Sequence, residues 1–143
     1  MTIHQISVFL ENRAGQLAEI TGLLSDTHID LRALNIAETA DYGVLRIIVD
    51  QPETAASLLL SNGVILSMTP VVAVSVPDRP GGLAEVLHFI SEAGIDVEYM
   101  YSVFGQSAGK AYMIFRVADA KKLIEVLESH GIAPATGEEL GIH

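Results

Sequence analysis

The stretch that decides the fold reads Asn12-Arg13-Ala14-Gly15-Gln16-Leu17-Ala18-Glu19-Ile20, and a second version reads Asp78-Arg79-Pro80-Gly81-Gly82-Leu83-Ala84-Glu85-Val86. The two versions lie 66 positions apart, and an Asp recurs downstream at the same spacing, as Asp30 and Asp96. A repeat of this length indicates a duplicated domain. We therefore predict one domain over residues 1–68, a second over residues 69–135, and a C-terminal tail over residues 136–143 for which we predict no structure.

The first copy alternates between strand and helix patterns. Residues 3–10 alternate apolar and polar side chains, as expected of a half-buried strand. Leu17, Ile20 and Leu24 then follow at helical spacing, which predicts a helix over residues 15–27. Strands are expected at 30–39 and 44–50, joined by a hairpin turn at 40–43. A helix over 52–61 and a strand over 64–68 complete the copy.

The second copy repeats this order. Strands are expected at 71–76, 96–104 and 111–117, and the longer connection 105–110 is expected to be mobile and a place for a partner to dock. Leu83, Val86 and Ile90 mark one helix, and Leu123 and Leu127 mark the other. Pro70 is expected to break the chain into two strands, because it cannot donate a ladder hydrogen bond. The fold class is thus α+β, with two tandem ferredoxin-like βαββαβ domains whose antiparallel sheets carry both helices on one face.

Composition excludes several classes of partner. Half of the residues are hydrophobic, so the chain is globular, and its net charge of −10 argues against nucleic acid and against anionic membranes. Cysteine is absent and the five histidines show no ligand spacing, so we expect no metal and no cofactor. The N-terminal residues do not resemble a signal peptide, which makes the cytoplasm the expected location.

The repeated loop has the chemistry of a carboxylate site. Gly15 and Gly81 come just before a helix, whose first N–H groups lack internal partners and favour an anion. The Asn12 side chain can bridge the ammonium and carboxylate of an amino acid, and Asp30 or Asp78 can pair with the ammonium. Leu10, Leu17 and Leu31 would supply an apolar lining, which favours branched-chain or aromatic ligands over serine. We expect the ligand at the interface of the two copies, with its carboxylate on the N–H groups of residues 14–17.

Purely structural interpretations compete with this one. Asn12 and Asp78 are also good helix N-caps, and the two glycines suit tight turns. Leu17 and Leu83 are expected in the core under either interpretation. Arg13 is expected to be solvated, as a surface Arg beside a loop usually is.

The pattern resembles the ACT domain family, whose members are small amino-acid-binding regulatory modules with this element order. The resemblance covers residues 3–134 and is carried by the two loops and by Ile29-Asp30-Leu31 and Gly94-Ile95-Asp96-Val97. It implies a ligand site built from Leu10, Asn12, Arg13, Ala14, Gly15, Gln16, Leu17, Asp30 and Leu31, and in the second copy from Asp78, Pro80, Gly81, Gly82, Leu83 and Asp96.

The first copy is most similar to the serine-sensing domain of phosphoglycerate dehydrogenase. It departs from that domain at Asp30, where the family has Asn, and at Leu10, where the family has a ligand-contacting His. Ala14 also replaces the proline of the motif. The resemblance therefore implies an amino-acid site without implying serine specificity.

We predict a regulatory protein that is not an enzyme. It would sense a free L-amino acid and signal through conformation or assembly, as a homodimer acting on a separately encoded enzyme of amino-acid metabolism. One alternative is an interaction module that docks on a metabolic enzyme and binds no ligand. A less favoured alternative is an acylphosphatase-like hydrolase, which needs an Arg in the first loop, such as Arg13 or Arg79, and an Asn on the second strand, such as Asn35.

Overall fold

A computed structural model describes residues 1–11, 13–38, 41–105 and 109–143. It divides the chain into two compact units. The N-terminal unit comprises His4–Thr69 with Gly141–His143, and the C-terminal unit comprises Pro70–Leu140 with Met1–Ile3. Among the described residues, none of the helices has the length and apolar character needed to cross a lipid bilayer.

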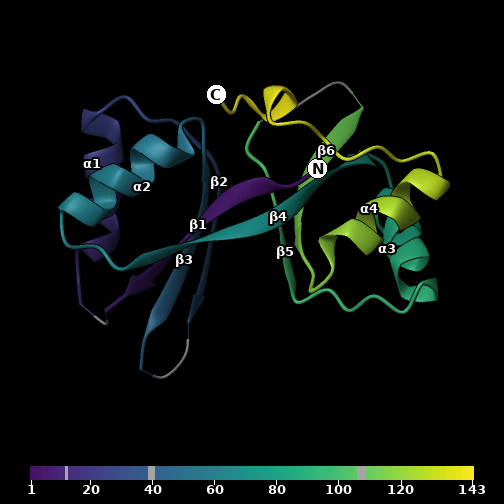
Figure 1. The fold of residues 1–143 in the computed structure, drawn as a ribbon, viewed down its shortest axis with the longest axis horizontal. Helices are drawn as coiled ribbons and strands as arrows, with labels where there is room; N and C mark the ends of the chain where they lie inside the picture. Colours follow the sequence, from purple (N-terminus) through teal and green to yellow (C-terminus); the bar gives the residue numbers. More distant parts are fainter. Residues whose placement is uncertain (12, 39–40, 106–108) are drawn as a thin grey trace. The chain divides into compact units, whose positions relative to one another are not determined.

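The N-terminal unit has the predicted order of strands and helices. It contains β1 (Ile3–Leu10), α1 (Gln16–Asp26), β2 (Leu31–Glu38), β3 (Gly43–Val49), α2 (Pro52–Ser61) and the start of β4 (Leu66–Pro77). Its strands lie in the order β2-β3-β1-β4, and β3 is antiparallel to both of its neighbours. The Phe9 N–H donates to the Ile65 carbonyl at 3.0 Å, just before β4 begins. Helices α1 and α2 lie beside each other (Figure 1).

The C-terminal unit repeats the plan with the rest of β4, then α3 (Gly82–Glu92), β5 (Tyr99–Ser102), β6 (Lys110–Arg116) and α4 (Ala120–Ser129). The order is β4-β6-β5, with β6 antiparallel to both neighbours. The fourth strand position holds only a bridge between Pro134 and Val74, supported by a 2.8 Å hydrogen bond from the Ala135 N–H to the Ala73 carbonyl. Together with the N-terminal unit, this confirms the predicted ferredoxin-like fold.

Each unit buries its own core between the helices and one face of the sheet. In the N-terminal unit the buried side chains include Ile6, Val8, Ile20, Leu24 and Leu59. In the C-terminal unit they include Val74, Val86, Phe115, Leu123 and Leu127. The alternation in the strands and the helical spacing predicted these faces, because both periodicities place every apolar residue of a stripe on one side.

The prediction that Pro70 divides a strand is wrong. β4 runs without a break from Leu66 to Pro77. The pairing of β4 with β6 begins only at Val72, so the ladder with β6 needs no N–H donor at position 70. The fixed φ of proline is compatible with extended chain, and the Pro70 carbonyl accepts a hydrogen bond from Arg116 Nη1 at 2.9 Å.

Three further predictions are corrected. The strand expected at 96–104 is reduced to β5, Tyr99–Ser102. Helices α1 and α3 begin later than Asn12 and Asp78, and their N-caps are Gly15 and Gly81, so side-chain capping does not explain Asp78. Leu17 is 36% exposed and is not part of the core. Three predicted segments fall partly outside the described residues: the first loop at residue 12, the hairpin turn at residue 40, and the mobile connection at residues 106–108.

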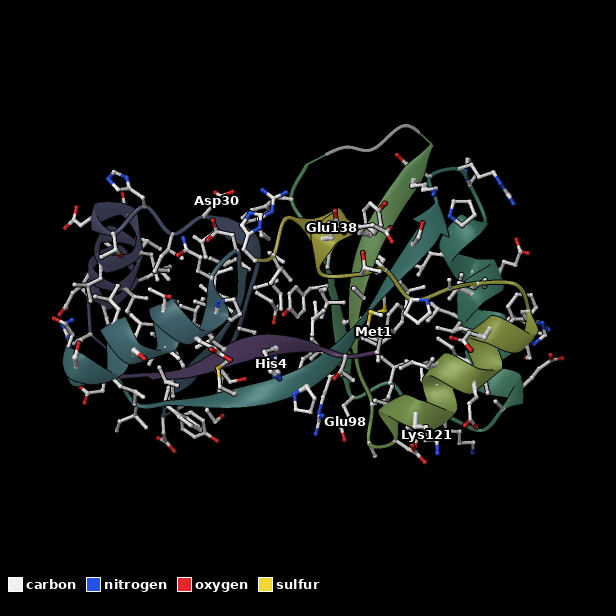
Figure 2. The ribbon with its side chains drawn as sticks, turned by 45° about the horizontal axis from the view of Figure 1, so that its top comes forward. Met1, His4, Asp30, Glu98, Lys121 and Glu138 are labelled. Atoms are coloured by element: carbon white, nitrogen blue, oxygen red, sulfur yellow. The ribbon has the colours of Figure 1, made fainter. Side chains whose placement is uncertain are left out.

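The tail is ordered by a signal that the sequence contains. Thr136-Gly137-Glu138-Glu139 matches a capping box, in which the first and fourth residues cap each other. The Glu139 N–H donates to Thr136 Oγ1 at 3.1 Å, and the Thr136 N–H donates to Glu139 Oε1 at 3.3 Å. This starts the 3₁₀ helix η1 (Glu138–Leu140), on which Figure 2 labels Glu138. Leu140 is buried at its end.

Asp119→Ala is expected to lower the free energy of unfolding by about 1 kcal/mol, the usual effect of removing an N-cap. The Asp119 carboxylate accepts from the Lys122 N–H at 3.1 Å at the start of α4. Gln51 occupies the matching position before α2, 68 residues earlier, and makes no side-chain cap. Gln51→Ala is therefore the control for urea unfolding, and an equal loss from both variants would contradict the assignment.

Candidate functional site

In each unit, a glycine with positive φ comes just before the first helix: Gly15 before α1 and Gly81 before α3. Gly15 and Gly81 both have φ near 86°, a conformation that costs other residues about 1–2 kcal/mol. A Cβ built on Gly15 would meet no atom within 4 Å. The tight turn thus accounts for both glycines, and the space around Gly15 is open.

A pocket of about 360 Å³ lies within the N-terminal unit beside this loop. It is formed by the end of β1, the following loop, the first half of α1, the β2–β3 turn and the α2–β4 turn. The lining residues are Phe9, Leu10, Glu11, Arg13, Gln16, Glu19, Ile20, Leu23, Asp41, Tyr42, Asn62, Gly63, Val64 and Ile65. Its volume is in the range of small-molecule sites.

These turns meet because of the order of the strands. β1 and β2 are both antiparallel to β3, so their C-terminal ends lie at the same end of the sheet, where Leu10 and Glu38 both pair with Gly43. Helix α2 then returns the chain from the far end of β3 to this end. The loop after β1, the β2–β3 turn and the turn after α2 therefore come together, although they are far apart in the sequence.

The pocket contains three of the predicted ligand residues. Leu10, Arg13 and Gln16 line it. Ala14, Gly15 and Leu17 are exposed and are not among the lining residues. Asn12 lies outside the described residues. The expectation of a site between the two copies stays a prediction.

Asp30 and Leu31 lie at the other end of the unit. Leu31 pairs with Val49, six residues along β3 from the Glu38–Gly43 pair beside the pocket, which is roughly 20 Å along a strand. Figure 2 labels Asp30 just before β2, away from the β1–α1 loop. The Asp30 carboxylate pairs with Arg32 at 3.0 Å. The length of strand β2 therefore separates Asp30 from this pocket.

Charged side chains surround the mouth of the pocket. Arg13 lies 3.1 Å from Glu19 and 3.7 Å from Glu11, and its side chain is 50% exposed. Arg13 thus lies at the surface, as predicted, and exposed pairs of this kind contribute at most about 1 kcal/mol to stability. Gln16 Oε1 accepts from the Glu11 N–H at 2.7 Å, which ties the helix start to the end of β1.

Sequence reasoning missed most of the lining. Phe9, Glu19, Tyr42, Asn62 and Ile65 were not predicted as site residues. The turn signals at 40–43 and 62–63 were recognised, and the strand order alone puts both turns beside the first loop. That combination is the signal that could have found the pocket.

The C-terminal unit has a pocket at the matching place. It measures about 440 Å³ and is lined by Ser75, Pro77, Gly109, Lys110, Gly131, Ile132, Ala133, Pro134 and Glu139. Most of these positions correspond to those of the first pocket, 66 or 68 residues later. Tyr112 donates to Glu139 Oε2 at 3.3 Å beside it.

The residues predicted in the second copy do not line this pocket. Asp78, Pro80, Gly81 and Asp96 are exposed, and Leu83 packs against the core of the C-terminal unit. Gly82 is buried, and a Cβ on it would collide with the Pro77 carbonyl oxygen. The first turn of α3 therefore packs closely against the end of β4 and leaves no space there.

Two other chemistries are not supported by the geometry. Asn35 Oδ1 accepts from Arg46 Nη1 at 2.9 Å and is not among the residues that line the pocket with Arg13. The pair of residues named for an acylphosphatase-like reaction is therefore not assembled there. No group of three or more His, Asp or Glu side chains able to hold a metal ion occurs in the described part of the chain.

The fold and the pockets define a protein made of two ferredoxin-like domains, each with a cavity of small-molecule size at the same end of its sheet. The model of the ACT domain pair family matches residues 1–140, and the chain belongs to that family. The resemblance of the two loops is thereby confirmed. No curated protein matches this chain.

Solved structures show the same fold. The protein BT0572 from Bacteroides thetaiotaomicron is 40% identical, with a TM-score of 0.91 over 99% of this chain and 96% of that chain. The ligand-free regulatory subunit of aspartate kinase from Thermus thermophilus is similar in fold, at 14% identity and a TM-score of 0.62 over 88% and 91% of the two chains. Aspartokinase III from E. coli, in complex with lysine and aspartate, matches 91% of this chain and 31% of its own, at 15% identity and a TM-score of 0.52.

Proposed function

We propose that this protein is a regulatory protein that binds a free L-amino acid in the pocket of the N-terminal unit. The observation that carries the proposal is the position of that pocket, on the loop by which the chain resembles amino-acid-binding modules. Its lining combines apolar side chains, among them Leu10, Ile20, Leu23 and Val64, with seven polar or charged ones. A cavity in which polar groups orient a ligand beside apolar side chains is the usual form of a small-molecule site.

Arg13 is the group best placed to hold the ligand carboxylate. It is the only cationic residue among the described residues that line the pocket. Its guanidinium has five donors, of which the contacts with Glu11 and Glu19 use a part. The neighbouring carboxylates can accept from the ligand ammonium, so both charged ends of an amino acid find partners at the mouth.

The response would be a change in conformation or assembly. A ligand shifts such an equilibrium only by its difference in affinity for the two states, and couplings of about 1–3 kcal/mol are usual. We propose that a homodimer, and through it a separately encoded enzyme of amino-acid metabolism, responds to the ligand. The regulatory subunit of aspartate kinase shows that a fold of this kind occurs as a subunit of an enzyme.

Thermal shift measurements with each of the twenty amino acids are expected to identify at least one that raises the melting temperature. Ligand at about a hundred times its Kd stabilises the native state by about 2.7 kcal/mol. Arg13→Ala is expected to weaken that ligand about tenfold or more, because the carboxylate loses a charged hydrogen-bond partner.

Arg79→Ala is the matched control. Arg79 lies 66 positions later, pairs with Glu85 at 3.4 Å and is not among the residues that line the second pocket. It should leave affinity unchanged. If no amino acid raises the melting temperature and calorimetry detects no binding, the proposal is wrong, and an interaction module without a ligand becomes the better account.

A further inference from the structure

The pocket of the N-terminal unit carries more negative charge than an ordinary amino acid can satisfy. Three carboxylates line it, from Glu11, Glu19 and Asp41, against the single guanidinium of Arg13. A ligand with one carboxylate and one ammonium uses Arg13 for the first and one carboxylate for the second. Two carboxylates then remain at the mouth without a cation from the ligand.

Exposed aromatic and aliphatic side chains accompany these carboxylates. Phe9 is 47% exposed, Tyr42 49% and Ile65 68%, and all three line the pocket. Aromatic rings attract ammonium and guanidinium groups through the negative potential of their faces. An aliphatic stem that ends in a cation would cover this apolar surface and bring its charge to the carboxylates.

The matching pocket of the C-terminal unit lacks this combination. At the positions of Phe9, Glu11 and Tyr42 it has Ser75, Pro77 and Lys110. Lys110 and Glu139 are the charged residues in its described lining, and their charges cancel. The fold repeats the cavity, whereas the acidic and aromatic groups belong to one copy only.

We infer that the N-terminal pocket selects amino acids with a cationic side chain, such as L-lysine, over neutral ones of the same length. This rests on the proposed function and names its ligand class. The net charge of −10 acts in the same direction, since the field of the whole protein favours a cation over an anion. The inference replaces the branched-chain or aromatic preference expected from Leu10, Leu17 and Leu31, of which only Leu10 lines the pocket.

L-lysine and L-norleucine form the matched pair of probes, because they differ by the side-chain ammonium alone. Calorimetry on the full chain should give a Kd for L-lysine about tenfold lower than for L-norleucine, the combined effect expected of an exposed ion pair and a cation–π contact. At about 1 M salt the preference should shrink, since exposed charges are then screened within a few ångströms.

Glu19→Gln is expected to reduce the preference for L-lysine about threefold. Glu85→Gln is its control, because Glu85 occupies the same helical position and pairs with Arg79 as Glu19 pairs with Arg13. The control should leave the preference unchanged, and both variants should keep the parental melting temperature.

The outcomes separate the inference from the proposed function. Equal or tighter binding of L-norleucine, or an equal effect of Glu19→Gln and Glu85→Gln, would overturn the inference while amino-acid binding stands. Failure of both probes and of all other amino acids would overturn the proposed function itself.

Discussion

Phe115→Ala is expected to lower the free energy of unfolding by about 3–5 kcal/mol, the usual effect of deleting a large core side chain. Phe115 is fully buried on β6, where it lies between Val72 of β4 and Met100 of β5. It is the largest of the side chains that are fully buried. Removal of its ring leaves a cavity next to both neighbouring strands, β4 and β5. A shift of one strand alone cannot fill that cavity.

Phe104→Ala is the control, because Phe104 has the same side chain and is 49% exposed. It should cost less than about 1 kcal/mol, as surface substitutions usually do. Urea unfolding followed by circular dichroism measures both. Similar losses for the two variants would show that Phe115 does not support the core in the way its burial indicates.

Gly82→Ala is expected to destabilise the protein by about 3 kcal/mol, because overpacking of a tight site costs about 1–3 kcal/mol and a backbone clash lies at the upper end. The new Cβ would collide with the carbonyl oxygen of Pro77 and lie 3.0 Å from its carbonyl carbon. Both atoms belong to the backbone, so relief requires the end of β4 or the start of α3 to move.

Gln16→Ala tests the same position in the first copy, 66 residues earlier. There a full side chain is already present, and its loss removes mainly the exposed hydrogen bond to the Glu11 N–H. The expected change is about 1 kcal/mol or less. If Gly82→Ala were as mild as Gln16→Ala in thermal unfolding, the loop before α3 would be more adaptable than its packing indicates.

The contrast between Gln16 and Gly82 also bears on function. The two residues occupy the same place in the repeat, but Gln16 lines a pocket and Gly82 is pressed against β4. The sequence pattern makes the two loops equivalent. The structure instead accommodates a full side chain at Gln16, whereas a Cβ at Gly82 would collide with the Pro77 carbonyl oxygen.

Local patterns predicted the fold because each of them acts over a few residues. The spacing of Ile20 and Leu24, and the alternation of Ile6 and Val8, specify which face of an element is buried. The repeat then predicts the same order of strands and helices in both copies. The errors arose where distant residues decide. Pro70 lies within strand β4 because the pairing of β4 with β6 starts only at Val72. Leu140 is buried although the tail shows little apolar patterning.

The amino-acid sequence alone therefore determined the class of fold and the duplication. Only the tertiary structure decided which side chains share the pocket, because it brings together turns as far apart in the sequence as Leu10 and Ile65. It also separated Asp30 from the loop by the length of a strand, and it paired Arg13 with two carboxylates. Charge and shape in a cavity depend on strand order and register, which no local periodicity contains.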